Sequence, residues 1–232
     1  MSTDSQRGFF LTFEGLDGSG KTTQIKRLSA WLTTQKNVPV NPIVTRQPGG
    51  TETGDRIRTL LLDSKSSDLS ANTELALMFA DRAQAIHEVI LPALSSGHMV
   101  VCDRFTDSTE AYQGGGRELG SKIVLDLHRL ICGTLQPDLT ILLLPNLHAS
   151  LARARRRNSR QIQSNGTDES RFEQEQAPFF RRVHDKYREI AAREPVRVVV
   201  IEGDLNVEQV HEQVITVVAE RLQQFAAMQL TQ

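Results

Sequence analysis

Blocks of apolar and polar residues follow one another along this chain in an order that predicts strands alternating with helices. Runs rich in Val, Ile, Leu and Phe predict five short strands, at residues 9–13, 38–45, 99–103, 138–144 and 196–201, of which the second is broken at its start by prolines. Between these runs apolar residues recur at helical spacing, as Ile25, Leu28 and Leu32 do after the first strand. Because strands of a parallel sheet that is covered on both faces are apolar throughout, the pattern predicts an α/β fold with helices on both sides of a five-stranded parallel sheet.

The segments between the strands differ in how strongly they favour helices. Further helices are predicted around residues 54–62, 72–95, 173–193 and 207–218, from Leu147 onward, and where Ile123, Leu127, Leu130 and Ile131 recur. Residues 104–117 hold three consecutive glycines and are expected to form a long loop or the start of a helix. Residues 158–170 have almost nothing apolar to bury, which predicts a mobile segment.

The clearest chemical signal lies directly after the first strand. Residues 15–22 read GLDGSGKT and match the phosphate-binding pattern GxxxxGK[ST], between an apolar strand and a helical pattern. Glycines let backbone N–H groups turn toward phosphate oxygens, and the helix N-terminus adds a positive dipole end. Lys21 is expected to neutralise the outer phosphates, and the Thr22 hydroxyl to hold Mg²⁺. The predicted ATP-binding residues here are Gly15, Leu16, Asp17, Gly18, Ser19, Gly20, Lys21, Thr22 and Thr23.

Two further polar clusters follow other predicted strands. Ligands of open parallel sheets bind beyond the carboxyl ends of the strands, so the phosphate loop, residues 46–51 and residues 103–104 should share one crevice. Asp103 ends its strand, where it either faces Mg²⁺, directly or through water, or caps a helix. Arg46, Arg58 and Arg104 have the guanidinium geometry that a phosphate monoester acceptor requires, although Arg58 also fits a solvated helix position.

Composition limits the alternatives. A chain of 232 residues with ordinary apolar content fits a single domain over residues 1–232. Its 27 basic and 28 acidic residues nearly cancel, which argues against a nucleic-acid partner. Cys102 and Cys132 lie in apolar patterns without metal-ligand spacing, which is typical of core thiols in a reducing compartment. No signal region or apolar run near 18 residues is present, so we expect a soluble cytoplasmic protein without a membrane partner.

An arginine-rich run precedes the polar segment and consists of Arg153, Arg155, Arg156, Arg157 and Arg160. Such a run fits a solvated face or a nucleic-acid patch. It also fits a lid whose arginine stabilises the transferred phosphoryl group once the site closes. The phosphate loop carries no cation besides Lys21, which favours a lid over residues 153–172.

Several motifs together resemble thymidylate kinase, in its bacterial form. The similarity lies in residues 13–23, 45–51, 103–113, 137–140 and 171–175 and in the arginine run, so it covers nearly the whole chain. The resemblance implies the P-loop nucleoside monophosphate kinase fold with a lid, usually as a homodimer. It also implies phosphorylation of dTMP to dTDP in dTTP synthesis, with ATP as donor and Mg²⁺ as cofactor.

The resemblance also assigns roles to individual residues. Lys21, Asp103, Arg160 and Arg171 are expected to be catalytic, Thr22 and Asp103 to hold the metal, and Arg153 to approach ATP. The expected dTMP-binding residues are Asp17, Arg46, Pro48, Arg58, Met78, Phe79, Arg82, Arg104, Ser108, Thr109, Tyr112 and Gln113. Within this set, Arg82, Ser108 and Gln113 address the thymine, and Tyr112 crowds out a ribose 2′-hydroxyl.

Three departures from the family pattern leave choices open. Gln47 stands where the family commonly has Glu. Met78 occupies the slot of a base-stacking phenylalanine and Phe79 follows it, so either residue is a candidate for the base contact. Ser170 replaces an Asp before Arg171, and the lid is longer than usual, so the choice of catalytic lid arginine stays open. The alternatives to dTMP kinase are a kinase for another nucleoside monophosphate and a non-kinase P-loop NTPase.

Overall fold

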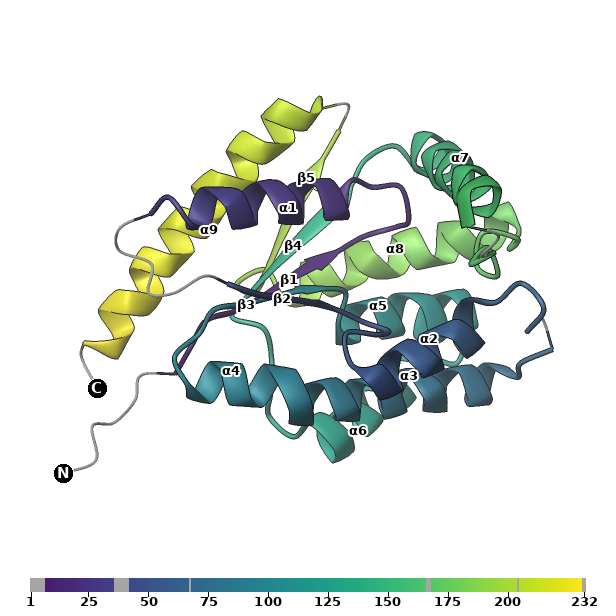
Figure 1. The fold of residues 1–232 in the computed structure, drawn as a ribbon, viewed down its shortest axis with the longest axis horizontal. Helices are drawn as coiled ribbons and strands as arrows, with labels where there is room; N and C mark the ends of the chain where they lie inside the picture. The colour runs from purple at the N-terminus through teal and green to yellow at the C-terminus, as the bar shows by residue number, and fades with distance from the viewer. Residues whose placement is uncertain (1–6, 36–41, 67, 166–167, 204, 231–232) are drawn as a thin grey trace.

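A five-stranded, wholly parallel sheet forms the centre of the molecule, with strand order β2-β3-β1-β4-β5 (Figure 1). The computed structural model describes residues 7–35, 42–66, 68–165, 168–203 and 205–230. The strands are β1 (Phe10–Glu14), β2 (Ile43–Arg46), β3 (Val100–Asp103), β4 (Leu139–Leu144) and β5 (Val198–Glu202). The predicted fold class is thus confirmed. The second strand begins later than predicted, at Ile43, and the earlier residues 38–41 lie outside the described residues.

Helices connect the strands and cover both faces of the sheet. They are α1 (Lys21–Leu32), α2 (Glu52–Leu62), α3 (Ala71–Ala85), the π-helical turn η1 (Ile86–Ile90), α4 (Leu91–Ser95), α5 (Thr106–Thr109), the π-helical segment η2 (Glu110–Gly116), α6 (Ser121–Cys132), α7 (Leu147–Asn165), α8 (Ala177–Arg193) and α9 (Val207–Gln229). Figure 1 shows α1 and α9 on one face of the sheet and the larger group of helices on the other.

Alternating side chains of β1 divide the core between the two faces. Leu11 and Phe13 pack with α1 and α9, whereas Phe10 packs with α3, α4 and α6. Successive side chains of a strand point to opposite faces, so one apolar strand contributes to both layers. Beyond β4 and β5, α8 closes a third cluster of buried residues together with η2.

The glycine-rich segment at residues 104–117 is helical, which settles the choice between a loop and a helix. α5 and η2 run on from each other and end at Gly116, against which α8 packs. A Cβ at Gly116 would lie 2.5 Å from the Phe179 ring, and one at Gly115 would lie 2.8 Å from Cβ of Lys186. Close approach of α8 therefore explains these glycines, which serve packing and not a turn.

The structure adds detail to two predictions about the helical segments. Residues 158–165 of the polar stretch continue α7, whereas residues 166 and 167 lie outside the described residues, so the mobility expected of residues 158–170 stays a prediction. In α6 the buried side chains are Val124, His128 and Cys132, while Leu130 is 80% exposed. The apolar residues that marked this helix in the sequence therefore lie largely on its outer face.

Candidate active site

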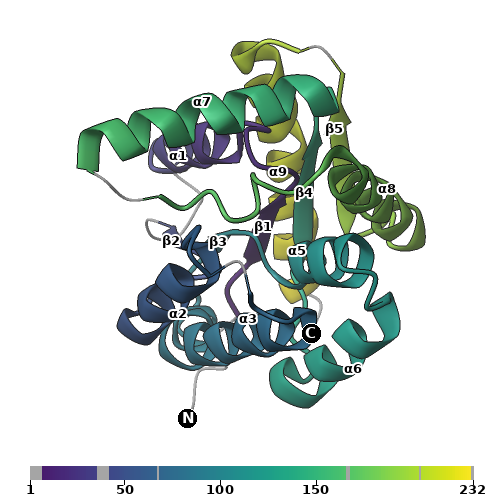
Figure 2. The ribbon, with the colours of Figure 1, turned by 90° about the vertical axis from the view of Figure 1, so that its right-hand side faces the viewer.

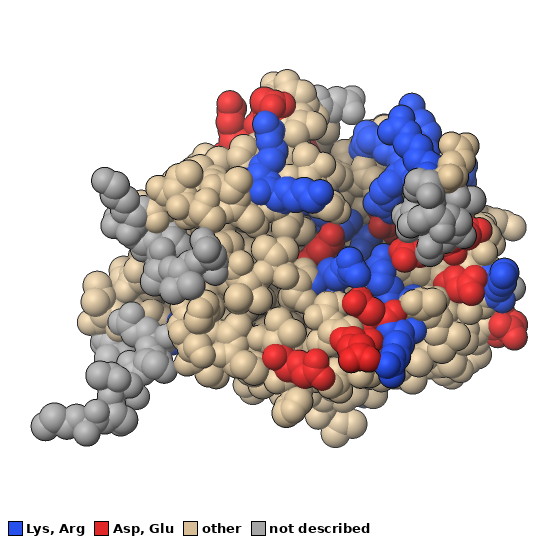
Figure 3. All heavy atoms as spheres, in the orientation of Figure 1, with Lys and Arg blue, Asp and Glu red and all other residues tan. Residues whose placement is uncertain are grey.

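One large cavity, of about 890 Å³, opens at the carboxyl ends of the central strands. The site residues predicted from the sequence that line it are Asp17, Gly18, Ser19, Gly20, Lys21, Thr22, Thr23, Arg46, Pro48, Arg58, Met78, Arg82, Asp103, Arg104, Ser108, Thr109, Tyr112, Gln113 and Arg153. On the face seen in Figure 3, Lys and Arg side chains gather over α7 and in the hollow beside it. Figure 2 shows that α7 crosses the sheet at the end where β4 leads into it.

The phosphate loop joins β1 to α1 in a tightly packed turn. Gly15 has φ 129°, and a Cβ there would lie 2.2 Å from the carbonyl oxygen of Leu143. Any larger residue would therefore clash with β4 as well as strain the backbone. Gly20, with φ 104°, precedes the first helical residue, Lys21. The loop thus delivers backbone N–H groups and the α1 N-terminus to the cavity, as anion binding requires.

Lys21 lies buried against the loop. Its Nζ donates to the carbonyl oxygens of Gly15 and Leu16, both at 2.9 Å. Burial, followed by the neighbouring Arg104 guanidinium, lowers the pKa of Lys21 to about 8. A phosphate group bound beside Lys21 would favour its charged form, which burial and Arg104 disfavour.

Asp103 has a carboxylate oxygen that could bind a metal ion, because no hydrogen bond among the described residues occupies it. It ends β3 opposite Phe13 of β1 and Arg46 of β2 in the sheet register. Its Oδ1 is buried and has no hydrogen-bond partner among the described residues. Mg²⁺ binds carboxylate and hydroxyl oxygens together with substrate phosphates, so Asp103 and Thr22 fit the donor set that this ion prefers.

Arg104 joins the phosphate loop to the segment that follows β3. Its φ is 71°, rare for a residue with a side chain. The guanidinium donates to Asp17 Oδ1 at 3.0 Å, to Ser108 Oγ at 3.0 Å and to the Tyr112 hydroxyl at 3.5 Å. Although burial opposes ionisation, Arg104 and then Lys21 hold the pKa of Asp17 well below its usual range. An ordered cation thus faces the cavity between the two loops.

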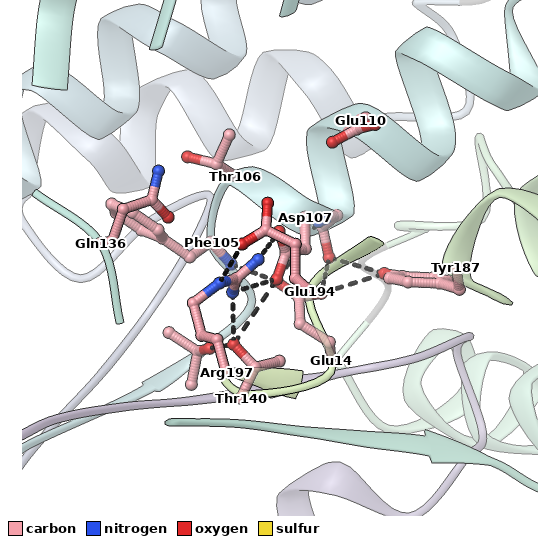
Figure 4. Close-up of polar contacts among 12 residues, drawn as sticks. Glu14, Phe105, Thr106, Asp107, Glu110, Gln136, Thr140, Tyr187, Glu194 and Arg197 are labelled. Carbon is pink, nitrogen blue, oxygen red and sulfur yellow. Dashed lines mark hydrogen bonds and ion pairs between the residues drawn. The ribbon is translucent and has the colours of Figure 1, made fainter. Parts of the chain in front are cut away.

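Glu14, the last residue of β1, binds the segment that follows β3 through its carboxylate (Figure 4). One carboxylate oxygen accepts the backbone N–H of Phe105 at 2.7 Å, and the other accepts the hydroxyls of Ser108 and Tyr187, the latter at 3.0 Å. Burial, followed by the charge of Asp107, raises the pKa of Glu14 to about 7. Glu14 therefore ties the Arg104–Ser108 turn and α8 to the end of β1, directly before the phosphate loop.

A buried ion pair fixes α5 to the sheet behind Glu14. Arg197 donates to the two Asp107 oxygens at 2.7 and 3.0 Å and to Thr140 Oγ1 at 2.8 Å. Figure 4 shows Arg197 placed between Asp107, Thr140 and Glu194. A bidentate pair of this kind fixes orientation as well as distance, so it keeps α5 and the cavity residues that follow it in register with β4.

The deep end of the cavity presents unused hydrogen-bonding atoms. The buried Arg82 donates through Nε to Gln47 Oε1 at 2.8 Å and through Nη2 to Thr109 Oγ1 at 2.8 Å. Its Nη1 is buried without a partner among the described residues, and so is Oε1 of Gln113. Both residues line the cavity, so a ligand that reaches this end of it could pair with the free donor and the free acceptor.

Met78 and Phe79 occupy different places. Met78 lines the cavity, whereas Phe79 is buried in the core beside it. The Phe79 ring supports Arg82, whose guanidinium carbon lies 4.9 Å from the ring centroid. Of the two candidates, the structure therefore places Met78, and not Phe79, at the cavity surface.

Two arginines near the cavity rim have acidic partners. Arg46 pairs with Asp55 at 3.1 Å. Arg58 pairs with Glu169 at 2.8 Å and donates to the Pro48 carbonyl oxygen at 3.1 Å. Both side chains line the cavity, so Arg58 is not simply a solvated helix residue.

The arginines of the run divide between the cavity and other places. Arg153 donates to the Gly18 carbonyl oxygen at 2.7 Å, which brings α7 to the phosphate loop. Arg157, one helical turn later, lies 3.7 Å from Asp17 and 3.6 Å from Glu173. Arg160 is exposed and lies outside the cavity lining. Arg171 is 5% exposed and pairs with Glu74 at 2.6 Å, also outside the lining.

Comparison with known proteins assigns the family. A family model described as thymidylate kinase matches residues 13–214. The chain belongs to the thymidylate kinase family. A thymidylate kinase of Pelobacter propionicus is 44% identical over 208 residues, which cover 90% of this chain and 92% of that protein. One of Geobacter sulfurreducens is 47% identical over 202 residues, covering 87% of this chain and 92% of that protein.

A solved structure supports the same assignment for the fold. The crystal structure of thymidylate kinase from Ehrlichia chaffeensis matches with a TM-score of 0.72 and 32% sequence identity, over 92% of this chain and 99% of that one. The chain is therefore a kinase with the P-loop nucleoside monophosphate kinase fold. Among its described residues, every helix is too short or too polar to cross a membrane.

Some residues at the cavity of this family member were given no individual role from the sequence. They include Glu14, which supports the cavity from below, and Arg157, Asn158, Glu169, Phe172 and Glu173, which line it. Burial, followed by Asp17, raises the pKa of Glu173 to about 6. Arg157 had a usable signal, because it lies four residues after Arg153 and hence on the same face of a helix. Glu173 lies in the motif at residues 171–175, but the motif gave it no role, since its importance depends on the position of Asp17 in the fold.

Proposed function

We propose that this chain transfers the γ-phosphoryl group of ATP to the 5′-phosphate of dTMP, which yields ADP and dTDP. Membership in the thymidylate kinase family supports both substrates. The observation that carries the choice of base is the unpartnered pair at the deep end of the cavity, the donor Nη1 of Arg82 and the acceptor Oε1 of Gln113. A thymine edge offers the complementary acceptor, its 4-carbonyl, and the complementary donor, its N3–H.

The mechanism divides the charges between two loops. The phosphate loop and Lys21 bind the outer phosphates of ATP, and Arg104, oriented by Asp17, binds the phosphate of dTMP. Thr22 and Asp103 are the residues that would hold Mg²⁺. When bound, Mg²⁺ neutralises charge on the phosphate oxygens of the donor. The two phosphates are thereby aligned for in-line transfer without a covalent intermediate.

The arginines of α7 supply the remaining charge stabilisation. Arg153 and Arg157 lie on the face of α7 that lines the cavity, and neither has a carboxylate closer than 3.6 Å among the described residues. We assign to them the stabilisation of negative charge on the transferred group, and to residues 153–172 the role of a lid that excludes water. Arg160 and Arg171 have no part in this assignment, because neither lines the cavity.

Tyr112 and Met78 complete the nucleoside site. The Arg104 guanidinium carbon lies 5.1 Å from the centroid of the Tyr112 ring, and this ring also packs against Phe172. Its position is therefore rigid, as exclusion of a ribose 2′-hydroxyl requires. Met78 contributes an adaptable apolar contact for the base, with a sulfur atom that interacts well with aromatic rings.

A coupled assay of ADP release tests the proposal. Purified enzyme with MgATP should consume ATP rapidly with dTMP and at least about 10³-fold less efficiently with CMP, because CMP mismatches both unpartnered groups and carries a 2′-hydroxyl. Equal turnover of the two acceptors would replace the proposal by a kinase for another nucleoside monophosphate. ATP consumption that ignores the acceptor, with a salt-dependent shift of DNA or RNA, would favour a non-kinase NTPase.

We also infer a cytoplasmic homodimer. The location agrees with two buried free thiols, Cys102 and Cys132, which suit a reducing compartment. The dimer agrees with the exposed apolar side chains of α6, Ile123, Leu130 and Ile131, which a second copy would cover. Light scattering during size exclusion should give about twice the chain mass of 25.9 kDa, and a monomer at micromolar concentration would contradict the dimer.

A further inference from the structure

The buried carboxylate of Glu74 holds the side chain of Gln113, one of the two residues proposed to bind the base. Glu74 of α3 is fully buried, and its oxygens accept from three side chains. These are the Gln113 amide Nε2 at 2.8 Å, Arg171 Nη2 at 2.6 Å and Arg117 Nη2 at 3.1 Å. Both guanidiniums are donors only, so they hold Glu74 as an acceptor.

This arrangement determines which end of the Gln113 amide faces the cavity. Turning the amide over would place its carbonyl oxygen against the carboxylate of Glu74, an acceptor facing an acceptor at 2.8 Å. With the NH₂ group committed to Glu74, the carbonyl oxygen is the free end, and it is the buried atom without a partner among the described residues. A ligand that reaches these two cavity residues therefore finds an unpaired acceptor at Gln113 and an unpaired donor at Arg82.

We propose that Glu74 is a specificity-determining positioning residue, which selects pyrimidines with an N3–H and a 4-carbonyl by fixing the Gln113 amide. This inference rests on the proposed function, because it concerns the base of the same acceptor. Cytosine presents an unprotonated N3 and a 4-amino group, so it faces Gln113 with an acceptor and Arg82 with a donor. Buried groups left in such mismatches cost enough to reject the wrong base.

Arg171 and Arg117 hold the Glu74 carboxylate in place. Arg171 also donates to the carbonyl oxygens of Ser66 at 2.8 Å and Leu61 at 3.2 Å. It thus links Glu74 to the end of α2 and to the last residues of the proposed lid. Arg117 lies just past η2, the segment that carries Gln113, and its guanidinium carbon lies 4.9 Å from the Phe179 ring centroid. Arg171 therefore acts on the choice of base through Glu74, away from the transferred phosphoryl group.

Steady-state kinetics of Glu74→Gln with dTMP and dCMP test the proposal. In this variant the two arginines compete for the single amide oxygen at position 74. The new NH₂ group then faces Gln113, whose amide turns its own NH₂ group to the cavity. The ratio of kcat/KM for dTMP to that for dCMP should fall by about 10- to 100-fold. The fall should come from a higher KM for dTMP, with the KM for ATP unchanged.

Glu110→Gln is the matched control. Glu110 is also a buried glutamate, lies on η2 and pairs with Arg193 at 2.7 Å, but among the described residues its carboxylate accepts no hydrogen bond from the Gln113 side chain. This variant should keep the wild-type ratio even if its thermal stability falls. If Glu74→Gln does not fold, Glu74→Asp retains the charge for both arginines and withdraws the carboxylate from Gln113. Its ratio should fall in the same direction.

The outcomes separate the inference from the proposed function. A wild-type enzyme that does not phosphorylate dTMP would end the proposed function and this inference with it. A wild type that prefers dTMP, with folded Glu74 variants that keep its ratio, would overturn the inference alone. Equal losses of kcat/KM for both nucleotides would also overturn it, because a merely structural role predicts that result.

Discussion

Arg104 combines an unusual backbone with a central place in the cavity. A φ of 71° in a residue with a side chain costs on the order of 1–3 kcal/mol, so the surroundings must enforce it. They do so through hydrogen bonds on both sides, since the Arg104 N–H reaches Phe13 O at 2.9 Å and the next N–H reaches Glu14. The backbone turn aims the guanidinium at Asp17 and the cavity, where an acceptor phosphate would lie.

Replacement of Arg104 tests this role. For Arg104→Ala we expect the KM for dTMP to rise by about 10- to 100-fold, because a charge-assisted pair to the phosphate is lost. The KM for ATP should change by less than about threefold, since the phosphate loop and Lys21 remain. Initial rates over a grid of both substrate concentrations give the two constants. Arg56→Ala, at an exposed site on α2, is the control, and a defect confined to ATP would contradict the assignment.

Residues whose role depends on a distant partner were the least predictable from the sequence. The phosphate-loop residues were found from one contiguous motif, and most of them line the cavity. Arg171 resembled a lid arginine, but it pairs with Glu74, which lies 97 residues earlier in the chain. Sequence spacing carries no information about such a pairing, because only the folded sheet brings α3 and the segment after α7 together.

At the scale of elements, the apolar periodicity of the sequence predicted which strands and helices exist better than it predicted which of their side chains are exposed. All five strands occur where continuous apolar runs predicted them. In α6 the helical period is right, yet Leu130 is exposed and His128 is buried, held by Thr106 Oγ1 at 2.9 Å and Gln136 Nε2 at 2.9 Å. A polar side chain with two partners is buried without penalty, and hydrophobicity along the sequence does not reveal those partners.

α7 has one face toward the cavity and one toward solvent, which separates its arginines. For Arg157→Ala we expect kcat to fall by about 10²- to 10³-fold, because a cation near the transferred group is lost. The KM for dTMP should change little, since Arg157 does not bind the acceptor phosphate in the proposed mechanism. Single-turnover rates with saturating MgATP and dTMP measure the chemical step directly.

The same helix offers a control for charge alone. Arg156 is exposed and donates to the Ala152 carbonyl oxygen on its own helix, outside the cavity lining. Arg156→Ala should keep kcat within about twofold of the wild type, because surface charge far from the reacting group is screened. Equal losses in the two variants would indicate a general effect of the basic helix and would remove the specific role of Arg157.

At the scale of the whole molecule, near-neutral charge hides a strong local separation. The chain carries a formal net charge of −1, yet Lys and Arg side chains gather around the cavity, where both substrates are anions (Figure 3). Carboxyl groups lie buried beside these cations, and Glu14 is one. Such buried groups make the stability of the entire fold depend on pH.

The raised pKa of Glu14 determines in which direction the stability of the fold changes with pH. Its pKa in the folded protein, about 7, lies above its ordinary value of 4.5, so between these pH values the native state binds more protons than the unfolded chain. The free energy of unfolding should therefore fall as pH rises from 5 to 8, by about 3 kcal/mol at most on account of Glu14. Asp81 and Glu173, whose pKa values burial raises to about 6, act in the same direction.

Comparison with Glu14→Gln isolates the contribution of this one group. The variant keeps the side-chain size but cannot titrate, while Asp81 and Glu173 titrate alike in both proteins. Urea unfolding at pH 5, 6, 7 and 8 should show the wild type losing more stability than the variant, so that their difference shrinks as pH rises, by about 2 kcal/mol between the extremes. Parallel curves would mean that Glu14 is ionised throughout this range, held as an anion by the Phe105 and Ser108 N–H groups and by Arg104. The strength of those hydrogen bonds relative to burial therefore decides the result, because both act on the same carboxyl group with opposite sign.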